Sequence, residues 1–417
     1  MDRTYIKKLH IEHVRHLRNI EIALDNGDGP RHLILTGANG SGKTSVLDAL
    51  AGHLDAVRQG NGPEVFRKHV GDNERILLRM KQTGEPAADI RDVEKRIVAW
   101  EEKLADAKQG LTVEFNTSEG DLRHSFDDGN LILAHFGAQR AFRAEVPDYI
   151  EKVRFKEHYG PEDSPRRLFV KYLLDLKMTQ ALAANEGRSE RASEIQGWFD
   201  KIQDILRTIY EDPTLAIEFD ADTYHFNIQT RGRDGFDFNE ASDGFSAILD
   251  VVVGIMLRTV RGKSHAIRFD TPGIVLIDEI ENHLHLSLQR SILPFLIGLF
   301  PNVQFVVSSH SPFVLTSAPD VVVYDLQNNI MVDDGMTDNT YESVVRGYFE
   351  VDSLSKDLRE KYERYKLLTR KENPTGEDLV EIAQLELYLD EIPDYLALDV
   401  ATEYKKYKIE FHGGRSN

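Results

Sequence analysis

The sequence predicts an α/β fold in which short buried strands deliver functional loops at their carboxyl ends. Three apolar runs lead to this prediction, and each is followed directly by polar residues that carry chemistry. They occupy residues 33–35, 273–277 and 303–307. Short apolar runs without alternation are typical of strands that are covered on both faces of a sheet.

The first run leads into residues 37–44, GANGSGKT, which fit the phosphate-binding pattern G-x-x-x-x-G-K-[ST]. An apolar helix predicted over residues 45–50 completes the strand–loop–helix context, which disfavours a chance match. Glycines let backbone N–H groups converge on phosphates, Lys43 can reach the β/γ oxygens, and Thr44 can hold Mg²⁺. The chain is therefore predicted to bind a nucleoside triphosphate through Gly37, Asn39, Gly40, Ser41, Gly42, Lys43, Thr44 and Ser45.

The composition limits the class of protein. Of 417 residues, 41% are apolar and 29% are charged, which is ordinary for a globular protein, and the absence of cysteine excludes disulfides and thiolate chemistry. No apolar run approaches the roughly 20 residues of a membrane span, so we expect a cytoplasmic protein without a membrane partner. A net charge of −19 disfavours a surface that coats nucleic acid, so any DNA or RNA site must be local.

A small turn, Ser242-Asp243-Gly244, precedes an apolar helix predicted over residues 247–257. Free N–H groups and the positive end of the helix dipole suit an anion at such a turn. The tripeptide alone is common and indicates little. Its position between the phosphate loop and the acidic strand is what favours a nucleotide-binding role. Ser242 and Gly244 are candidate nucleotide-binding residues.

The run at 273–277 ends in Asp278 and Glu279. Asp278 would hold Mg²⁺, directly or through water, and Glu279 would polarise the attacking water. Two acids after a strand can also cap a helix, but the phosphate loop elsewhere in the chain favours the metal and base roles.

The run at 303–307 continues through two serines to His310. A histidine at the end of a neighbouring strand can reach the γ-phosphate as a donor and sensor, although a histidine satisfied within its loop is the alternative. Glu279, His310 and Lys43 are the candidate catalytic residues.

In this order, the four motifs resemble the nucleotide-binding domain of ABC-type ATPases, and more closely the soluble branch that contains SMC, RecF and OLD-like proteins. The loop spelling at 38–41, the opening at 6–12 and 17–22, and the run DEIENHLH at 278–285 favour that branch. The resemblance covers about residues 1–60, 110–145 and 213–335. It implies an ABC-ATPase head, with a mixed sheet and flanking helices, that hydrolyses ATP with Mg²⁺.

The resemblance also implies a homodimer or a higher ring of dimers. Two chains would sandwich two ATP molecules head to tail, each phosphate loop facing a Ser242–Gly244 turn, and residues 281–285 would couple the two sites. A switch loop with a metal-contacting glutamine is implied as well; Gln139 is the candidate, with His135 and Arg140 close by in sequence. Asp243 and Phe245 depart from the family's usual signature turn. A protein that binds ATP as a switch but hydrolyses it poorly is therefore a further alternative.

Four parts are predicted along the chain: an ATPase lobe with a short helical insertion (1–145), an inserted helical lobe (146–212), a second ATPase lobe (213–335) and a helical C-terminal extension (336–417). About 200 residues separate the phosphate loop from Ser242, too few for a long SMC arm. Helices are predicted at about 87–108, 353–370 and 378–391. Residues 377–404 carry acids but no lysine or arginine, which suits either a packed hairpin with an acidic face or a docking surface.

As a compact ATPase whose tail is too short and helical for a nuclease domain, the chain resembles ATPase subunits of bacterial anti-phage systems, such as the PtuA-like ATPases of Septu and retrons and the AriA-like ATPase of PARIS. That resemblance implies a sensor or scaffold ATPase controlling a separate nuclease or toxin. A RecF-like ATPase acting directly on DNA, and the motor half of a transporter, are the alternatives. The basic residues that could meet DNA, or serve equally as a solubilising or ATP-facing surface, are Lys7, Lys8, Arg15, Arg18, Arg140, Arg143, Lys152, Arg154, Lys156, Arg166 and Arg167.

Overall fold

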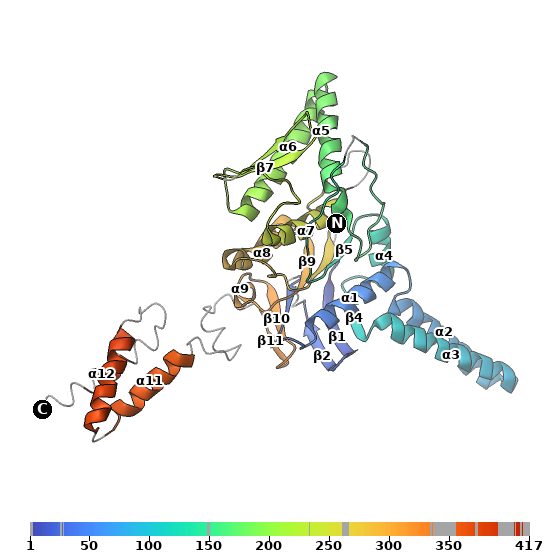
Figure 1. Cartoon of the computed structure of the whole chain (residues 1–417). Coiled ribbons are helices and arrows are strands. Elements are labelled where there is room, and N and C mark those ends of the chain that lie inside the picture. The colour runs from blue at the N-terminus through green and yellow to red at the C-terminus, as the bar shows by residue number, and fades with distance from the viewer. Residues whose placement is uncertain are drawn as a thin grey trace. The chain divides into compact units, whose positions relative to one another are not determined.

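The computed structural model describes residues 3–25, 27, 29–147, 151–232, 234–260, 267–333, 336, 356–371, 374–390, 404, 406–408 and 411. The chain divides into two compact units, residues 1–338 and 339–417. Figure 1 shows the ribbon of both.

A six-stranded sheet in the order β11-β10-β3-β9-β8-β5 forms the centre of the first unit. Neighbouring strands from β10 to β5 pair in parallel, and only β11 is antiparallel to its neighbour. The predicted α/β fold with a mixed sheet is thus confirmed. The strands are β3 (His32–Thr36), β5 (Ile132–Phe136), β8 (Gly273–Ile277), β9 (Val303–Ser308), β10 (Val321–Asp325) and β11 (Ile330–Val332).

A second, antiparallel sheet in the order β2-β1-β4 packs with helix α1 against one face of the central sheet. Leu33 and Leu35 of β3, and Ile274 and Leu276 of β8, point into this shared core, whereas the alternate residues of each strand do not belong to it. The period of two in a strand therefore assigns one set of side chains to each face. These elements are β1 (Ile6–Val14), β2 (Leu17–Ala23), β4 (Leu111–Phe115) and α1 (Lys43–Arg58).

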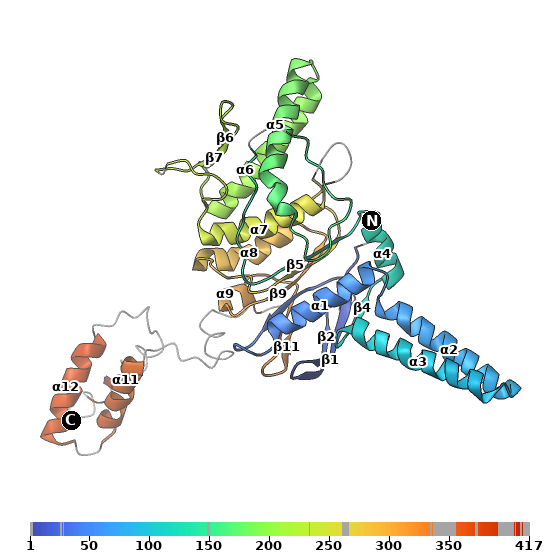
Figure 2. The same cartoon turned by 45° about the vertical axis from the view of Figure 1, so that its right-hand side comes forward.

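Helices α7 (Asp243–Arg258) and α8 (Leu286–Leu299) cover the other face (Figures 1 and 2). Almost every side chain of α7 from Ser246 onward is buried, as expected for a helix enclosed on all sides. It begins at Asp243, four residues earlier than the predicted apolar stretch, because the polar signature turn forms its first turn. The short α9 (Pro312–Leu315) follows β9.

Two helical hairpins project from this core (Figures 1 and 2). The first pairs α2 (Pro63–Thr83) with α3 (Ala87–Lys108); α3 matches the predicted helix, whereas α2 was not predicted. The second pairs α5 (Phe169–Asn185) with α6 (Ser189–Tyr210), preceded by the 3-10 helix η1 (Pro165–Leu168) and followed by a small sheet of β6 (Ala216–Phe219) and β7 (Phe226–Gln229). Helices are present from Pro165 to Tyr210 of the lobe predicted over residues 146–212, whereas its described residues 151–164 contain no helix.

The second unit contains α11 (Lys356–Thr369) and α12 (Gly376–Asp390). Tyr365, Leu368 and Ile382 form its small core together with Tyr404. Both predicted helices are present; their expected ends at residues 353–355 and 391 lie outside the described residues, as do residues 391–403 of the acidic stretch. The fourfold division into parts predicted from the sequence stays a prediction.

Two helix starts in the first unit cap each other. Glu64 at the beginning of α2 accepts the backbone N–H of Glu119 at 3.0 Å, and Glu119 accepts that of Glu64 at 2.9 Å. Glu119 opens α4 (Glu119–Asp127), and its side chain is buried. Burial raises the pKa of Glu119 to about 7, because removing a carboxylate from water penalises its charged form more than the single N–H compensates.

This pair predicts a pH dependence of stability. The folded-state pKa of Glu119 lies above its ordinary value of 4.5, so the folded chain binds an extra proton between these values and loses stability as pH rises from about 4.5 to 7. Glu119→Gln keeps the N–H acceptor but cannot ionise. We expect it to be more stable than the wild type at pH 8 by about 1–3 kcal/mol, and to match it near pH 4.5. Urea unfolding at both pH values measures this difference, and a gap that does not change with pH would contradict the assignment.

Candidate functional site

The loops after β3, β5, β8 and β9 meet at one edge of the central sheet. Asp278 donates its N–H to Phe136 O at 2.8 Å, and Ile280 donates to Ser308 O at 3.1 Å, so the parallel pairing continues past the strand ends. Because carboxyl ends of parallel strands face the same edge, residues more than 200 positions apart become neighbours. This edge holds most of the predicted catalytic residues.

The phosphate loop runs from Gly37 to Lys43 between β3 and α1. Gly37 and Gly42 have φ angles of 128° and 102°, in the region that favours glycine. A Cβ on Gly42 would lie 2.9 Å from Leu17 Cδ1, and one on Gly37 would lie 2.9 Å from Ser41 Oγ. The pattern thus needs glycine at both positions for backbone conformation and for space.

The loop is folded around the side chain of Lys43. The Lys43 ammonium is nearly buried and donates to Gly37 O at 2.8 Å and to Ala38 O at 3.2 Å. Burial lowers the pKa of Lys43, and the charges of Asp278 and Glu279 oppose that shift. Ser41 Oγ is buried and has no hydrogen-bond partner among the described residues. An ammonium and an unpaired hydroxyl in a glycine-rich loop at the start of a helix fit a phosphate group.

The closest link between the two halves of the site joins the phosphate loop to the acidic strand. Thr44 Oγ1 donates to Asp278 Oδ2 at 2.9 Å, and Ser308 Oγ donates to Asp278 Oδ1 at 2.5 Å. A hydroxyl and a carboxylate beside a phosphate site are oxygen ligands of the kind that Mg²⁺ takes in nucleotide enzymes. Thr44 and Asp278 therefore fit the predicted metal role.

Glu279 follows directly, with its backbone held in an unusual conformation. Its φ angle is 46°, uncommon for a residue with a side chain, and its N–H donates to Ser308 Oγ at 2.7 Å. No hydrogen bond or ion pair engages its carboxylate within the described part of the chain. The carboxylate can therefore accept a proton from a water molecule.

His310 lies beside the same charges. Burial lowers its pKa, the nearby Lys43 ammonium lowers it further, and Glu279 and Asp278 oppose the shift. At neutral pH the ring is therefore uncharged and can donate one N–H. Its backbone N–H donates to the carboxylate of Glu281, whose pKa is raised by burial, so the loop after β8 is tied to the histidine loop.

Ser242 and Gly244 are not joined to the phosphate loop by any hydrogen bond among the described residues. Ser242 is exposed at the N-cap of α7, and its side chain makes no capping bond. A Cβ on Gly244 would lie 2.6 Å from His283 O, so the turn packs closely on the loop at residues 281–285. Phe245 stacks on Tyr210 of α6 at a centroid distance of 3.9 Å, so the residue that departs from the usual signature pattern anchors the turn to the helical lobe.

Gln139 is exposed, and no hydrogen bond connects it with Thr44 or Asp278 within the described residues. Its metal role stays a prediction. The adjacent Arg140 was predicted to meet nucleic acid or nucleotide, and this is wrong: the side chain is buried and donates to main-chain carbonyls after β8. Sequence reasoning also missed Ser308, although a hydroxyl at the end of the neighbouring strand was the available signal.

Five of the ten other basic residues proposed for DNA form ion pairs within the chain. Ion pairs join Lys7 to Glu114, Lys8 to Glu21, Lys152 to Asp175, Lys156 to Asp163 and Arg166 to Asp250. Paired cations release fewer counterions on binding DNA, so these five residues contribute less to a phosphate-binding surface than free cations would.

A cavity of about 540 Å³ adjoins the phosphate loop. It lies between the β1–β2 hairpin and the turn after β10, and its lining includes His16, Arg18, Asn39, Ser41 and Gln327. Gln327 Oε1 also accepts the N–H of Ala38 at 3.0 Å, so this turn braces the loop. The cavity has room for the nucleoside of a nucleotide whose phosphates occupy the loop.

A family model described as "AAA domain, putative AbiEii toxin, Type IV TA system" matches residues 33–316, which contain the phosphate loop, the acidic strand and His310. The chain belongs to this family.

Three curated proteins are similar to this family member. The "Septu protein PtuA" of Bacillus mycoides (strain KBAB4) is 23% identical over 97% of the chain and 52% of its own length. The "Retron Ec83 probable ATPase" of Escherichia coli is 34% identical over 33% of the chain and 27% of its own length. The "Retron Vc95 probable ATPase" of Vibrio cholerae serotype O1 biovar El Tor is 58% identical over 11% of the chain and 9% of its own length. The chain spans about half the length of the first relative and less of the others.

Among solved structures, an SMC head bound to the C-winged helix domain of ScpA aligns with 80% of the chain and 99% of its own, at 12% identity and a TM-score of 0.38. The SMC head domain from Thermotoga maritima aligns with 77% and 94%, at 11% identity and a TM-score of 0.34. No described helix of this family member is both long and apolar enough to cross a bilayer.

The contact of Gly244 with His283 O predicts the outcome of two matched substitutions. Gly244→Ala must displace the 281–285 loop, so we expect ATP turnover to fall by about 10-fold. Gly298→Ala in α8 is the control, because nothing lies within 4 Å of its added Cβ. Steady-state phosphate release and thermal melting of both variants measure the effect. Equal turnover in the two variants would show that the close approach is not needed.

Proposed function

We propose that this chain is an ATP-binding and ATP-hydrolysing sensor or scaffold ATPase of bacterial anti-phage defence, in which closure of two heads controls a separate effector, a nuclease or a toxin. The observation that carries the ATPase assignment is the hydrogen bond between Thr44 Oγ1 and Asp278 Oδ2, which joins the phosphate loop to the acidic strand. Family membership and the names of the Septu and retron relatives support the defence setting.

The proposed substrate is ATP with Mg²⁺. The phosphates would lie against the backbone N–H groups of residues 37–45, with Lys43 at the β/γ oxygens and the nucleoside in the cavity beside His16. Thr44 and Asp278 would hold Mg²⁺, which supplies charge neutralisation on the phosphate oxygens. Gln139 would join them when its loop moves toward the site.

Hydrolysis would transfer the γ-phosphoryl group to water. The water oxygen forms a bond to the γ-phosphorus while the bond from that phosphorus to the β–γ bridging oxygen breaks, and ADP leaves. Glu279 orients the water and accepts its proton, because its carboxylate is otherwise unengaged. His310, neutral at physiological pH, donates its N–H toward the γ-phosphate.

The exposed signature turn supports the dimeric part of the proposal. Ser242 and Asp243 face solvent at the start of α7, where backbone N–H groups can donate to a phosphate. Within one chain no hydrogen bond ties this turn to the described phosphate loop, so a second head is the natural source of the ATP it binds. The tight packing of Gly244 against His283 would transmit closure to the loop after Glu279.

We assign any cutting or toxic activity of the system to the separate effector. The second unit is helical where it is described, and α11 and α12 pack around Tyr365 and Ile382. Direct action on DNA in repair or replication is the less favoured function, because five of the eleven candidate basic residues pair with carboxylates of the same chain and Arg140 is buried.

Glu279→Gln is expected to bind Mg-ATP and release phosphate at least about 100-fold more slowly than the wild type, because the base is lost while the binding groups remain. It should accumulate as a closed dimer, seen as a doubled mass by light scattering. Lys43→Ala is the control that cannot hold the phosphates and should stay unchanged on adding ATP.

In the native host with its neighbouring genes, Lys43→Ala should also abolish protection against phage in a plaque assay. Retained turnover in Glu279→Gln would refute the base assignment. Retained protection with Lys43→Ala would refute the defence role while leaving the ATPase chemistry intact.

A further inference from the structure

Arg140 is a buried arginine whose side chain is directed at the main chain that follows β8. Its Nη1 donates to the carbonyl oxygen of Asp278 and, at 2.9 Å, to that of Gly137. Its Nη2 donates to Glu279 O at 2.8 Å and approaches Ile280 O at 3.5 Å. One guanidinium therefore contacts three consecutive carbonyl groups, those of Asp278, Glu279 and Ile280.

These carbonyls flank the residue with the left-handed backbone. A φ of 46° at Glu279 costs about 1 kcal/mol or more, and such a conformation persists only where the surroundings fix it. Ser308 Oγ fixes the N–H side of Glu279, and Arg140 fixes the carbonyl side. The direction of the Glu279 carboxylate follows from this backbone.

We propose that Arg140 is a positioning residue: it fixes the main chain of Glu279 so that the carboxylate faces the reacting water. The proposal rests on the function proposed above, in which Glu279 is the base. Arg140 would act through Glu279 and would touch neither nucleotide nor nucleic acid.

The charge of Arg140 is balanced from α7, the helix that starts at the signature turn. The fully buried carboxylate of Asp250 on α7 attracts the Arg140 guanidinium electrostatically, and it forms an ion pair with Arg166 of η1. One turn earlier on α7, Ser246 Oγ accepts the N–H of Phe142 at 2.7 Å. The segment that carries Arg140 is thus bonded both to the helix after Ser242–Gly244 and to the loop of Glu279.

A lysine cannot reproduce this arrangement. The planar guanidinium presents two N–H-bearing nitrogens at fixed spacing, which lets it hold neighbouring carbonyls at once, whereas an ammonium is a single point donor. Arg140→Lys keeps the positive charge near Asp250 and removes the pair of N–H-bearing nitrogens at fixed spacing. The substitution therefore separates geometry from charge.

The first measurement compares ATP affinity and single-turnover phosphate release in Arg140→Lys and Arg140→Gln. We expect the Kd for Mg-ATP to stay within about 3-fold of the wild type while the rate of phosphate release falls by about 10- to 100-fold, because misplacing a catalytic group by an ångström can cost that much.

The second measurement places Arg140→Lys in the Glu279→Gln background. If Arg140 acts through Glu279, the added substitution lowers the residual rate by less than about 2-fold, since the group that it positions is already gone. An effect on the fold alone would lower the rate by the same factor in both backgrounds.

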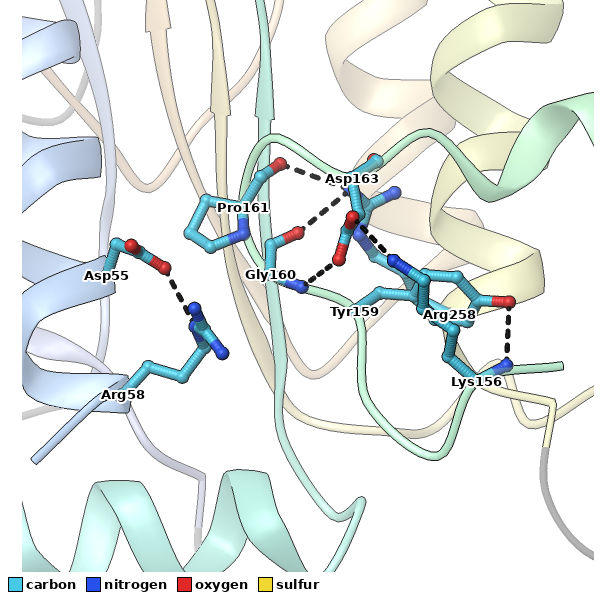
Figure 3. Close-up of polar contacts among 8 residues, drawn as sticks. All are labelled: Asp55, Arg58, Lys156, Tyr159, Gly160, Pro161, Asp163 and Arg258. Carbon is cyan, nitrogen blue, oxygen red and sulfur yellow. Dashed lines mark hydrogen bonds and ion pairs between the residues drawn. The ribbon is translucent and has the colours of Figure 1, made fainter.

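Arg258→Lys is the matched control. Arg258 is also a buried arginine that donates to backbone carbonyls. Its Nη1 donates to Gly254 O at 2.9 Å, and its Nη2 donates to the carbonyls of Gly160 at 3.4 Å, Pro161 at 3.1 Å and Asp163, the three that Figure 3 draws. It does not contact the loop after β8 through any of its bonds to described residues. We expect it to lower the melting temperature as much as Arg140→Lys does and to leave phosphate release per folded protein within about 3-fold of the wild type.

Several results would overturn the proposal. Undiminished phosphate release in both Arg140 variants would overturn it. An equal fall in the rate of phosphate release per folded protein in Arg140→Lys and Arg258→Lys would overturn it too. Loss of ATP binding in both Arg140 variants would also contradict it, because Arg140 would then support the fold and not Glu279. If Glu279→Gln itself released phosphate at the wild-type rate, the proposed function would fail instead, so the two failures are distinguishable.

Discussion

The candidate site depends on the parallel alignment of four buried strands, β3, β9, β8 and β5. Each strand is short and wholly apolar at its centre, so burial on both faces leaves little freedom to slip in register. Because the strands are parallel, their carboxyl ends form one edge, and the phosphate loop, Asp278, His310 and Arg140 all lie there. A one-residue shift of β8 would separate Asp278 from Thr44 and turn its side chains to the opposite face.

Around this edge, hydroxyls and backbone groups of neighbouring strands hold the acidic residues in place. Ser308 connects Asp278 to Glu279, and Glu281 connects the loop after β8 to the backbone of His310. Each link is short, partly or fully buried, and made between strands that are adjacent in space but distant in sequence. Such bonds keep their strength because water is largely excluded. The arrangement couples the backbones of Glu279 and His310 to neighbouring residues of the same edge.

Local patterns were enough to predict the parts of this site that depend on local structure. The glycines of the phosphate loop, with the strand before it and the helix after it, are enough to recognise that loop. The apolar runs before Asp278 and His310 predict the strands that lead to these two residues. Helix α2 was missed because its many charges obscure a narrow apolar face, and its partner α3 supplies most of the packing. The role of Arg140 could not be predicted, because a buried arginine and a surface arginine look the same until the carbonyls of β8 are placed around it.

The surface was harder to predict than the core for a related reason. Clusters of lysine and arginine in sequence suggested a nucleic-acid patch, but the fold pairs some of them with carboxylates, such as Lys7 with Glu114 across two strands and Lys152 with Asp175. Asn282 shows the same dependence on tertiary contacts, because its side-chain amide donates a hydrogen bond at 2.9 Å to the carbonyl oxygen of Ala138, the residue before Gln139. Pairings of this kind follow from the fold and leave no local signature.

The most direct test of the central claim is Mg²⁺-dependent phosphate release from ATP by purified wild-type protein and by Asp278→Ala, at ATP concentrations that saturate each. We expect turnover that requires Mg²⁺ in the wild type and is lost in the variant, with ATP still bound by the phosphate loop. Equal phosphate release by the two proteins would contradict it, because the bond between Thr44 and Asp278 would then mark no metal site.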